Sequence, residues 1–256
     1  MTREELQQLC DRGQQHLLAC DYVHAIQLLA WAESVAFKAR DFDTLARLYM
    51  PLQEARRLFR QRCGEGIFDL HAFSKSDVDR VEEIPEGLDD PIKSLFGQFA
   101  FGFFDGPRGS LDFRTLFRAN DVYAETFICK RYHGRDCYYV AFLPDEKARF
   151  RPNASASSLK EIESALSIGA FAIDSNDIPR PKAKGDNDSF AFVMSIWERL
   201  HAPYLKRARS ETDPLRRIEL YRQTIRVDPA CEGAHQELAK LAQQLARTAP
   251  APDFSA

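Results

Sequence analysis

Small residues at helical spacing recur near both ends of this 256-residue chain, and they limit its fold more than any other feature. Glycine or alanine at a crossing point lets two packed helices approach closely. In the first fifty residues the small positions alternate with larger apolar ones, at Gly13, Ala25, Leu29, Ala32, Phe42, Leu45, Ala46 and Tyr49. A related pattern returns at Tyr221, Pro229, Leu238 and Ala239. The chain is therefore predicted to contain a helical array interrupted by a different kind of structure.

The first of these patterns resembles the tetratricopeptide repeat, a helix pair of about 34 residues. Gly13, Ala25 and Ala32 match the three small positions of that family, and residues 42–49 reproduce the aromatic, leucine, small, tyrosine spacing of its next helix. Near the other end the resemblance continues at Ile218, Tyr221, Asp228-Pro229, Ala234, Leu238 and Ala239. The resemblance implies a divergent helical array. The alternative is a generic helical hairpin with alanine at a close crossing.

Between the helical blocks the sequence pattern changes to that of β-strands. Residues 95–104 form an aromatic run broken by glycines, and residues 123–131 and 137–143 are also strand-like. A helix after residue 110 would link the first two strands as a parallel crossover, and a turn at Gly134 would place Cys129 opposite Val140. With further strands at 66–70 and 168–173 and a helix at 158–167, we predict a small mixed sheet of about five strands with two helices of its own.

The predicted fold class is α+β, with a mixed α/β sheet domain inserted into a helical array. We assign residues 1–64 to the first helical block, 65–175 to the sheet domain, 176–189 to a linker, 190–247 to the second helical block and 248–256 to a disordered tail. Pro203 should kink or break the helix that contains it. Each block holds about one and a half repeats, and about three are needed for a continuous core. The two blocks are therefore expected either to stack on each other or to lean on the inserted sheet, and we favour direct contact between them.

The composition argues against several classes of partner. The formal net charge is −3, which gives no general attraction to nucleic acid or to acidic lipid. The apolar runs are far shorter than the roughly 20 residues that span a bilayer, and residues 1–8 lack the pattern of a secretory signal. We expect a cytoplasmic protein. Arg56, Arg57, Arg60 and Arg62 fit the negative end of a helix dipole, and the alternative, an RNA-facing patch, lacks interleaved aromatic residues.

The sequence indicates no cofactor and no metal. The six cysteines are scattered, without the Cys-x-x-Cys or Cys/His spacing that holds zinc. Our first hypothesis for the function is a protein-interaction or scaffold module with a peptide or protein partner, because arrays of the resembled family hold partners in a concave groove. The groove positions implied by the resemblance are Cys10, Gln14, Leu17, Gln236 and Lys240.

The second hypothesis is an enzyme or a small-ligand sensor with its site in the loop 105–110. A glycine-rich turn before a helix offers backbone amides to an anion, and Arg108 would add a positive charge beside Gly109 and Ser110. The loop lacks the glycine spacing of known phosphate-binding motifs, and Asp105 would repel an anion. Because no nucleophile with a partnered base is evident, we favour a role without catalysis. The partner, the oligomeric state and the openness of the groove are not fixed by the sequence.

Overall fold

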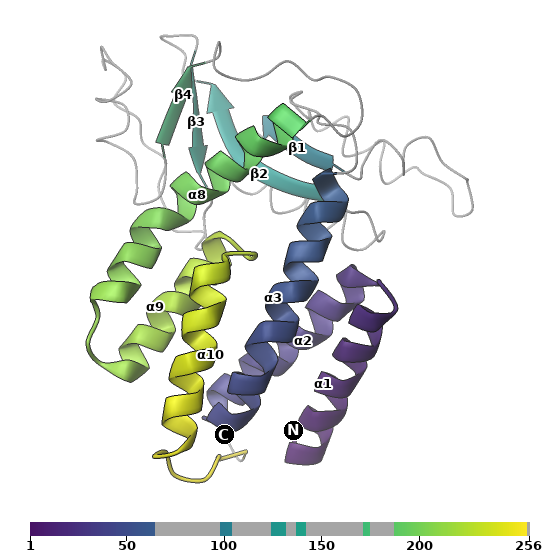
Figure 1. The fold of residues 1–256 in the computed structure, drawn as a ribbon, viewed down its shortest axis with the longest axis vertical. Helices are drawn as coiled ribbons and strands as arrows, with labels where there is room; N and C mark the ends of the chain where they lie inside the picture. The colour runs from purple at the N-terminus through teal and green to yellow at the C-terminus, as the bar shows by residue number, and fades with distance from the viewer. Residues whose placement is uncertain (65–97, 104–123, 132–136, 142–170, 175–186, 255–256) are drawn as a thin grey trace. The chain divides into compact units, whose positions relative to one another are not determined.

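The computed structural model describes residues 1–64, 98–103, 124–131, 137–141, 171–174 and 187–254 (Figure 1). These residues form six helices and four short strands. The chain divides into two compact units, one made of Met1–Phe59 with Tyr204–Ala256 and the other of Arg60–Pro203. The elements are α1 (Arg3–Leu18), α2 (Tyr22–Lys38), α3 (Phe42–Gly64), β1 (Gln98–Phe103), β2 (Ala124–Arg131), β3 (Cys137–Ala141), β4 (Phe171–Asp174), α8 (Asn187–Ser210), α9 (Pro214–Val227) and α10 (Glu232–Ala246).

Side-chain caps define where several helices of the first unit begin. The Thr2 hydroxyl accepts a hydrogen bond from the Glu5 amide at 3.2 Å, and the Glu5 carboxylate accepts one from the Thr2 amide at 2.6 Å. A threonine followed three residues later by a glutamate is the sequence pattern of a capping box, and the structure contains both of its bonds. Asp21 caps α2 in a similar way, and Asp213 followed by Pro214 begins α9.

The first hairpin, α1 with α2, is closely packed because a glycine lies at the crossing. A Cβ atom built on Gly13 would lie only 2.8 Å from Cγ and Cδ2 of Leu29. Ala25 and Ala32 on α2 are completely buried. The small residues therefore do what their spacing predicts: they let the two helix backbones approach closely and leave room for the side chain of Leu29.

The two ends of the chain share one hydrophobic core. Leu45 and Tyr49 of α3 belong to the same buried cluster as Tyr221 of α9 and Leu238 of α10. Figure 1 shows α10 beside α3, with α2 and α9 behind them. The contacts agree, since α3 touches α10 through Arg56 and His235, and α9 touches α2 through Arg222 and Glu33. The expected stacking of the terminal blocks is thus observed as helices packed into a single array.

Several local predictions need revision. The chain after residue 248 is not a free tail over its described part, because the Asp253 amide donates a hydrogen bond to the Ala39 carbonyl at 2.9 Å and Phe254 packs against the core. Pro203 lies inside α8, so the helix is not broken at this residue. Of the predicted linker, residues 187–189 are the start of α8 and the remainder lies outside the described residues.

In the second unit the described strands form a sheet in the order β1-β2-β3-β4. β1 and β2 are parallel, with Phe103 opposite Cys129, and the other neighbouring pairs are antiparallel. Cys129 also lies opposite Val140, the pairing expected from a turn at Gly134. Phe171 and Ile173 of β4 are buried, and the guanidinium of Arg199 on α8 stacks 3.8 Å above the Phe171 ring.

The predicted fold class is nevertheless wrong for the described part of the chain. An inserted α/β domain requires a sheet covered by helices of its own, and no such domain is seen among the described residues, which are mainly helical and pack helix against helix. The predicted helices after residue 110 and at 158–167, and the strand at 66–70, lie outside those residues. Strand-like periodicity indicates the local conformation of a segment, but it does not establish the layers that make a domain.

Candidate functional site

The predicted groove positions on α1 have different surroundings. Cys10 is buried beside Leu6 and Leu9, so it belongs to the core and is not available to a partner. Burial raises the pKa of its thiol to about 11, although the nearby Arg47 opposes this shift. Gln14 is exposed, and Leu17 is half-buried against the core. Of the three positions on this helix, Gln14 is exposed, Leu17 is half-buried and Cys10 belongs to the core.

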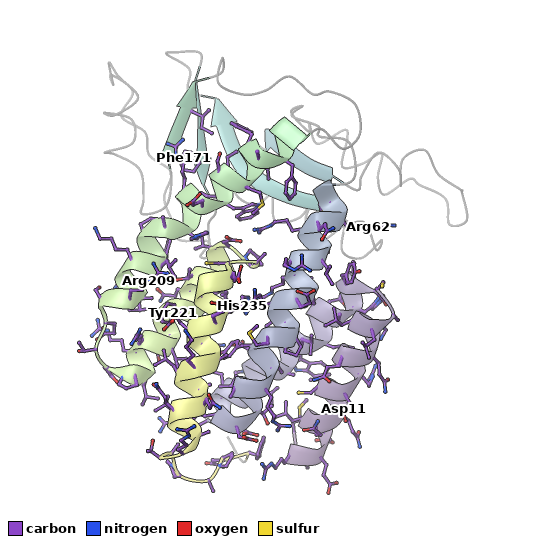
Figure 2. All side chains as sticks on the ribbon, viewed as in Figure 1. Asp11, Arg62, Phe171, Arg209, Tyr221 and His235 are labelled. Carbon is purple, nitrogen blue, oxygen red and sulfur yellow. The ribbon has the colours of Figure 1, made fainter. Side chains whose placement is uncertain are left out.

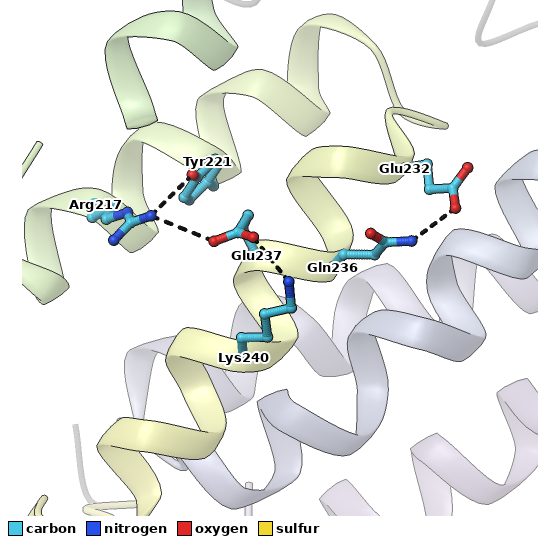
Figure 3. Close-up of polar contacts among 6 residues, drawn as sticks. All are labelled: Arg217, Tyr221, Glu232, Gln236, Glu237 and Lys240. Carbon is cyan, nitrogen blue, oxygen red and sulfur yellow. Dashed lines mark hydrogen bonds and ion pairs between the residues drawn. The ribbon is translucent and has the colours of Figure 1, made fainter. Parts of the chain in front are cut away.

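On α10 the two predicted positions take part in short-range polar contacts (Figure 3). The amide nitrogen of Gln236 donates to the Glu232 carboxylate at 2.7 Å, and Nζ of Lys240 lies 3.1 Å from Oε1 of Glu237. Arg217 of α9 donates to the other oxygen of Glu237 at 3.4 Å. Lys240 is exposed and Gln236 half-buried, so both are accessible from solvent.

An exposed row of side chains on α3, which we call the α3 stripe, lies between α1 and α10. It comprises Asp43, Arg47, Met50, Glu54 and Arg57, at spacings of four and three residues that place them on one helix face. Arg47 acts electrostatically on Cys10 of α1, whereas Arg57 interacts with Glu232 of α10. Arg57 also donates to both Glu54 oxygens, at 2.7 and 2.8 Å. The side chain of Met50 is 47% exposed in the middle of this charged row.

A buried polar cluster lies on the inside of the same unit and connects the two terminal blocks. The Glu33 carboxylate of α2 accepts hydrogen bonds from Nε and Nη2 of Arg222 at 2.6 and 3.1 Å, and from the Tyr49 hydroxyl at 3.0 Å. The Arg222 guanidinium also lies 3.6 Å from the Phe37 ring centre. Burial raises the pKa of Tyr49 well above its ordinary value, and the Glu33 charge adds to the shift. Tyr49 therefore remains a hydrogen-bond donor.

His235 extends this cluster on the side of α10 that faces α3 (Figure 2). Its Nε2 lies 2.9 Å from the Pro229 carbonyl and 3.3 Å from Nη1 of Arg56. Its ring meets Tyr49 edge to face, with centroids 6.3 Å apart. Burial, assisted by the positive charge of Arg56, lowers the pKa of His235 to about 3. The imidazole is thus neutral, and its Nε2–H donates to the Pro229 carbonyl.

A second cluster of titratable groups surrounds the turn between α1 and α2. Nδ1 of His16 and Nδ1 of His24 lie 2.8 and 2.9 Å from the same oxygen of Asp21, and the two rings stack with centroids 5.3 Å apart. Burial opposes ionisation of Asp21, but hydrogen bonds from His24 and His16 outweigh it, so the pKa of this carboxyl is lowered. This cluster was not predicted, because it contains no cysteine and lacks the Cys/His spacing of a zinc site. The signal was His-x4-Asp-x2-His across a helix boundary.

The remaining predicted positions fall into two groups. The arginines at the end of α3 do not form a common patch, because Arg56 contacts the Pro229 carbonyl, Arg57 pairs with Glu54, and the buried Arg60 stacks 4.5 Å from the Trp197 ring. Arg108, Gly109 and Ser110, with the whole loop 105–110, lie outside the described residues.

Comparison with known proteins yields no relative from which a role could be transferred. No protein-family model matches the chain, and neither a curated protein nor a solved structure shows significant similarity to it. Within the described residues, none of the helices combines the length and the apolar character that a membrane crossing requires.

Proposed function

We propose that the unit built from the two chain ends is a protein-interaction module that resembles a tetratricopeptide-repeat array. In this proposal a peptide or protein partner lies along the α3 stripe and touches the flanking helices at Gln14 and Lys240. The observation that carries the proposal is the position of Met50, a large apolar side chain that is 47% exposed among charged residues. An exposed apolar side chain within a polar rim is the usual arrangement of a contact site in a protein interface.

The packing of the unit supports this proposal. The α3 stripe and the flanking helices belong to one hydrophobic core, and the Glu33–Arg222 pair joins α2 to α9 beneath them. A preorganised surface loses little conformational entropy when a partner binds. The charges of the stripe alternate in sign, with Arg47 paired to Asp43 and Arg57 paired to Glu54. Such a surface favours a partner of mixed charge over a polyanion.

The test is affinity capture with the full-length protein, followed by cross-linking between the captured partner and the α3 stripe. The double variant Met50→Glu, Lys240→Glu should lose the captured partner and retain the helical circular dichroism of the wild type. The matched control is Gln27→Glu, Gln223→Glu, which changes exposed residues on α2 and α9. If the control loses the partner and the test variant keeps it, or if cross-links form only elsewhere, the proposal is wrong.

A further inference from the structure

The turn between α1 and α2 brings together three side chains whose chemistry is that of a metal site. His16 is in the last turn of α1, Asp21 is the cap of α2, and His24 is in the first turn of α2. One ligand atom from each of them lies within 4.8 Å of the other two. The side chains are 36%, 34% and 45% exposed, respectively, so an ion and its water have access from solvent.

The distances from the two imidazole nitrogens to the Asp21 oxygen are close to the ligand–ligand distances around a bound zinc ion. Zinc binds imidazole nitrogen and carboxylate oxygen at about 2.0–2.2 Å, which places two ligands of one tetrahedral ion about 3.3 Å apart. The two Nδ1 atoms are 2.8 and 2.9 Å from the Asp21 oxygen. Each nitrogen needs to move away from the Asp21 oxygen by only about half an ångström to admit the ion. Partial exposure of all three side chains allows a movement of this size.

The backbone holds the three groups in this arrangement without a metal. The Asp21 carboxylate also accepts a hydrogen bond from the His24 amide at 3.3 Å, which fixes its position at the helix start. The residue before it, Cys20, has φ of 61° and reverses the chain direction between the helices. Tertiary packing of α1 on α2 then sets the distance between the two imidazoles. The ligand set is thus largely preorganised.

We propose that His16, Asp21 and His24 bind one Zn²⁺ ion through Nδ1, a carboxylate oxygen and Nδ1, with water in the fourth position. The ion takes the place of the two Nδ1 protons, which otherwise form hydrogen bonds to the Asp21 carboxylate. Two nitrogens and one oxygen suit Zn²⁺ and its neighbours in the transition series, whereas Mg²⁺ prefers an all-oxygen shell. The ion cross-links the ends of two helices and fixes the geometry of the first hairpin.

The test is isothermal titration of the metal-free, full-length protein with Zn²⁺, in parallel with Mg²⁺. One equivalent of Zn²⁺ should bind and Mg²⁺ should not. His16→Gln, His24→Gln and Asp21→Asn should each weaken Zn²⁺ binding at least tenfold, and asparagine preserves the cap of α2. Cys20→Ser is the matched control and should bind as the wild type does. Unchanged affinity in the three ligand variants, or loss of binding in Cys20→Ser, would overturn the assignment.

Two measurements on the unmodified chain make the result independent of how the variants fold. With Co²⁺ in place of Zn²⁺, the protein should show the visible bands of a nitrogen and oxygen site without the intense thiolate charge-transfer band. Zn²⁺ should also protect His16 and His24 from carbethoxylation, as measured by peptide mass spectrometry. A thiolate band, or histidines modified equally with and without Zn²⁺, would show that the ion binds elsewhere.

Discussion

Glu33 and Arg222 are 189 residues apart in the sequence, yet they form a two-point ion pair with Nε–Oε1 and Nη2–Oε2 distances of 2.6 and 3.1 Å. Their side chains are only 10% and 12% exposed. The pair connects α2 to α9 and therefore one end of the chain to the other. Its consequences for stability can be measured directly.

Removal of one member of this pair should destabilise the protein strongly. Among the described residues, Arg222→Met leaves the buried Glu33 carboxylate with only the Tyr49 hydroxyl as a partner, which should lower the free energy of unfolding by about 3 kcal/mol. Urea denaturation provides the measurement. The matched control is Arg216→Met. Its pair with Glu211 is solvent-exposed, with the arginine side chain 65% exposed, so its loss should have little effect. Equal effects of the two variants would contradict a special role for the Glu33 pair.

Alanine substitutions at two helical glycines should have different effects on stability. Gly13→Ala places a methyl group 2.8 Å from Leu29 in the crossing of α1 and α2, so we expect a net loss of about 1–2 kcal/mol despite the better helix propensity of alanine. At Gly233 the nearest atom is Nη2 of Arg209 at 3.5 Å, an ordinary contact. Gly233→Ala should therefore be neutral or stabilising by up to about 1 kcal/mol. Thermal unfolding of both variants tests the prediction, and a stabilised Gly13→Ala would refute the close crossing.

His235 should make the stability depend on pH on the acidic side of neutrality. Its pKa is about 3 in the folded protein, whereas an unfolded chain binds the proton near the ordinary value of 6.5. Below pH 6.5 the unfolded state therefore binds more protons, so stability is lost as the pH falls from 6.5 towards 3, at up to about 1.4 kcal/mol per pH unit from this group.

The measurement for His235 is urea denaturation between pH 7 and pH 4.5. His235→Gln removes the titrating ring and should flatten the curve over this interval, even if the variant is less stable at pH 7. The two proteins should be compared by the slope of the free energy of unfolding against pH, since carboxylates elsewhere titrate in both. Parallel curves for the wild type and His235→Gln would contradict the assignment.

The segment after α10 should contribute to the stability of the first unit. Phe254 packs against the core and the Asp253 amide bonds to Ala39, so Phe254→Ala should lower the free energy of unfolding by about 1 kcal/mol. Ala251→Ser, at an exposed position in the same segment, should have no measurable effect. Chemical denaturation of both variants provides the test. Identical midpoints would indicate that the contact of Phe254 with the core does not stabilise the protein.

The sequence predicted the features that follow from local chemistry and periodicity. The capping box at Thr2 and Glu5, the small residues at Gly13, Ala25 and Ala32, and the helix start at Asp213 all have local signals, and the structure contains each of them. The joining of the two ends followed from an energetic argument, because neither block had enough repeats for its own core. The shared cluster of Leu45 and Tyr221 agrees with that argument.

What the sequence could not supply depends on contacts between distant residues. Cys10 has the spacing of a groove residue in the resembled family, but the packing of α1 buries it with Leu6 and Leu9. The contact of Glu33 with Arg222 has no local signal, and Phe254 looked like part of an unstructured tail until its neighbours in the fold were known. The inserted α/β domain was inferred from periodicity alone, which cannot show whether a sheet has helices packed over it.

The pairing of residues so far apart in the chain also affects how the protein is made. Glu33 leaves the ribosome long before Arg222, and at roughly 5–20 residues per second the delay for 189 residues is about 10–40 s. During this interval the first three helices expose the apolar surface that α9 and α10 later cover. We therefore expect the nascent chain to be prone to aggregation until α9 and α10 have been made, and a chaperone that binds apolar segments would protect it during that time.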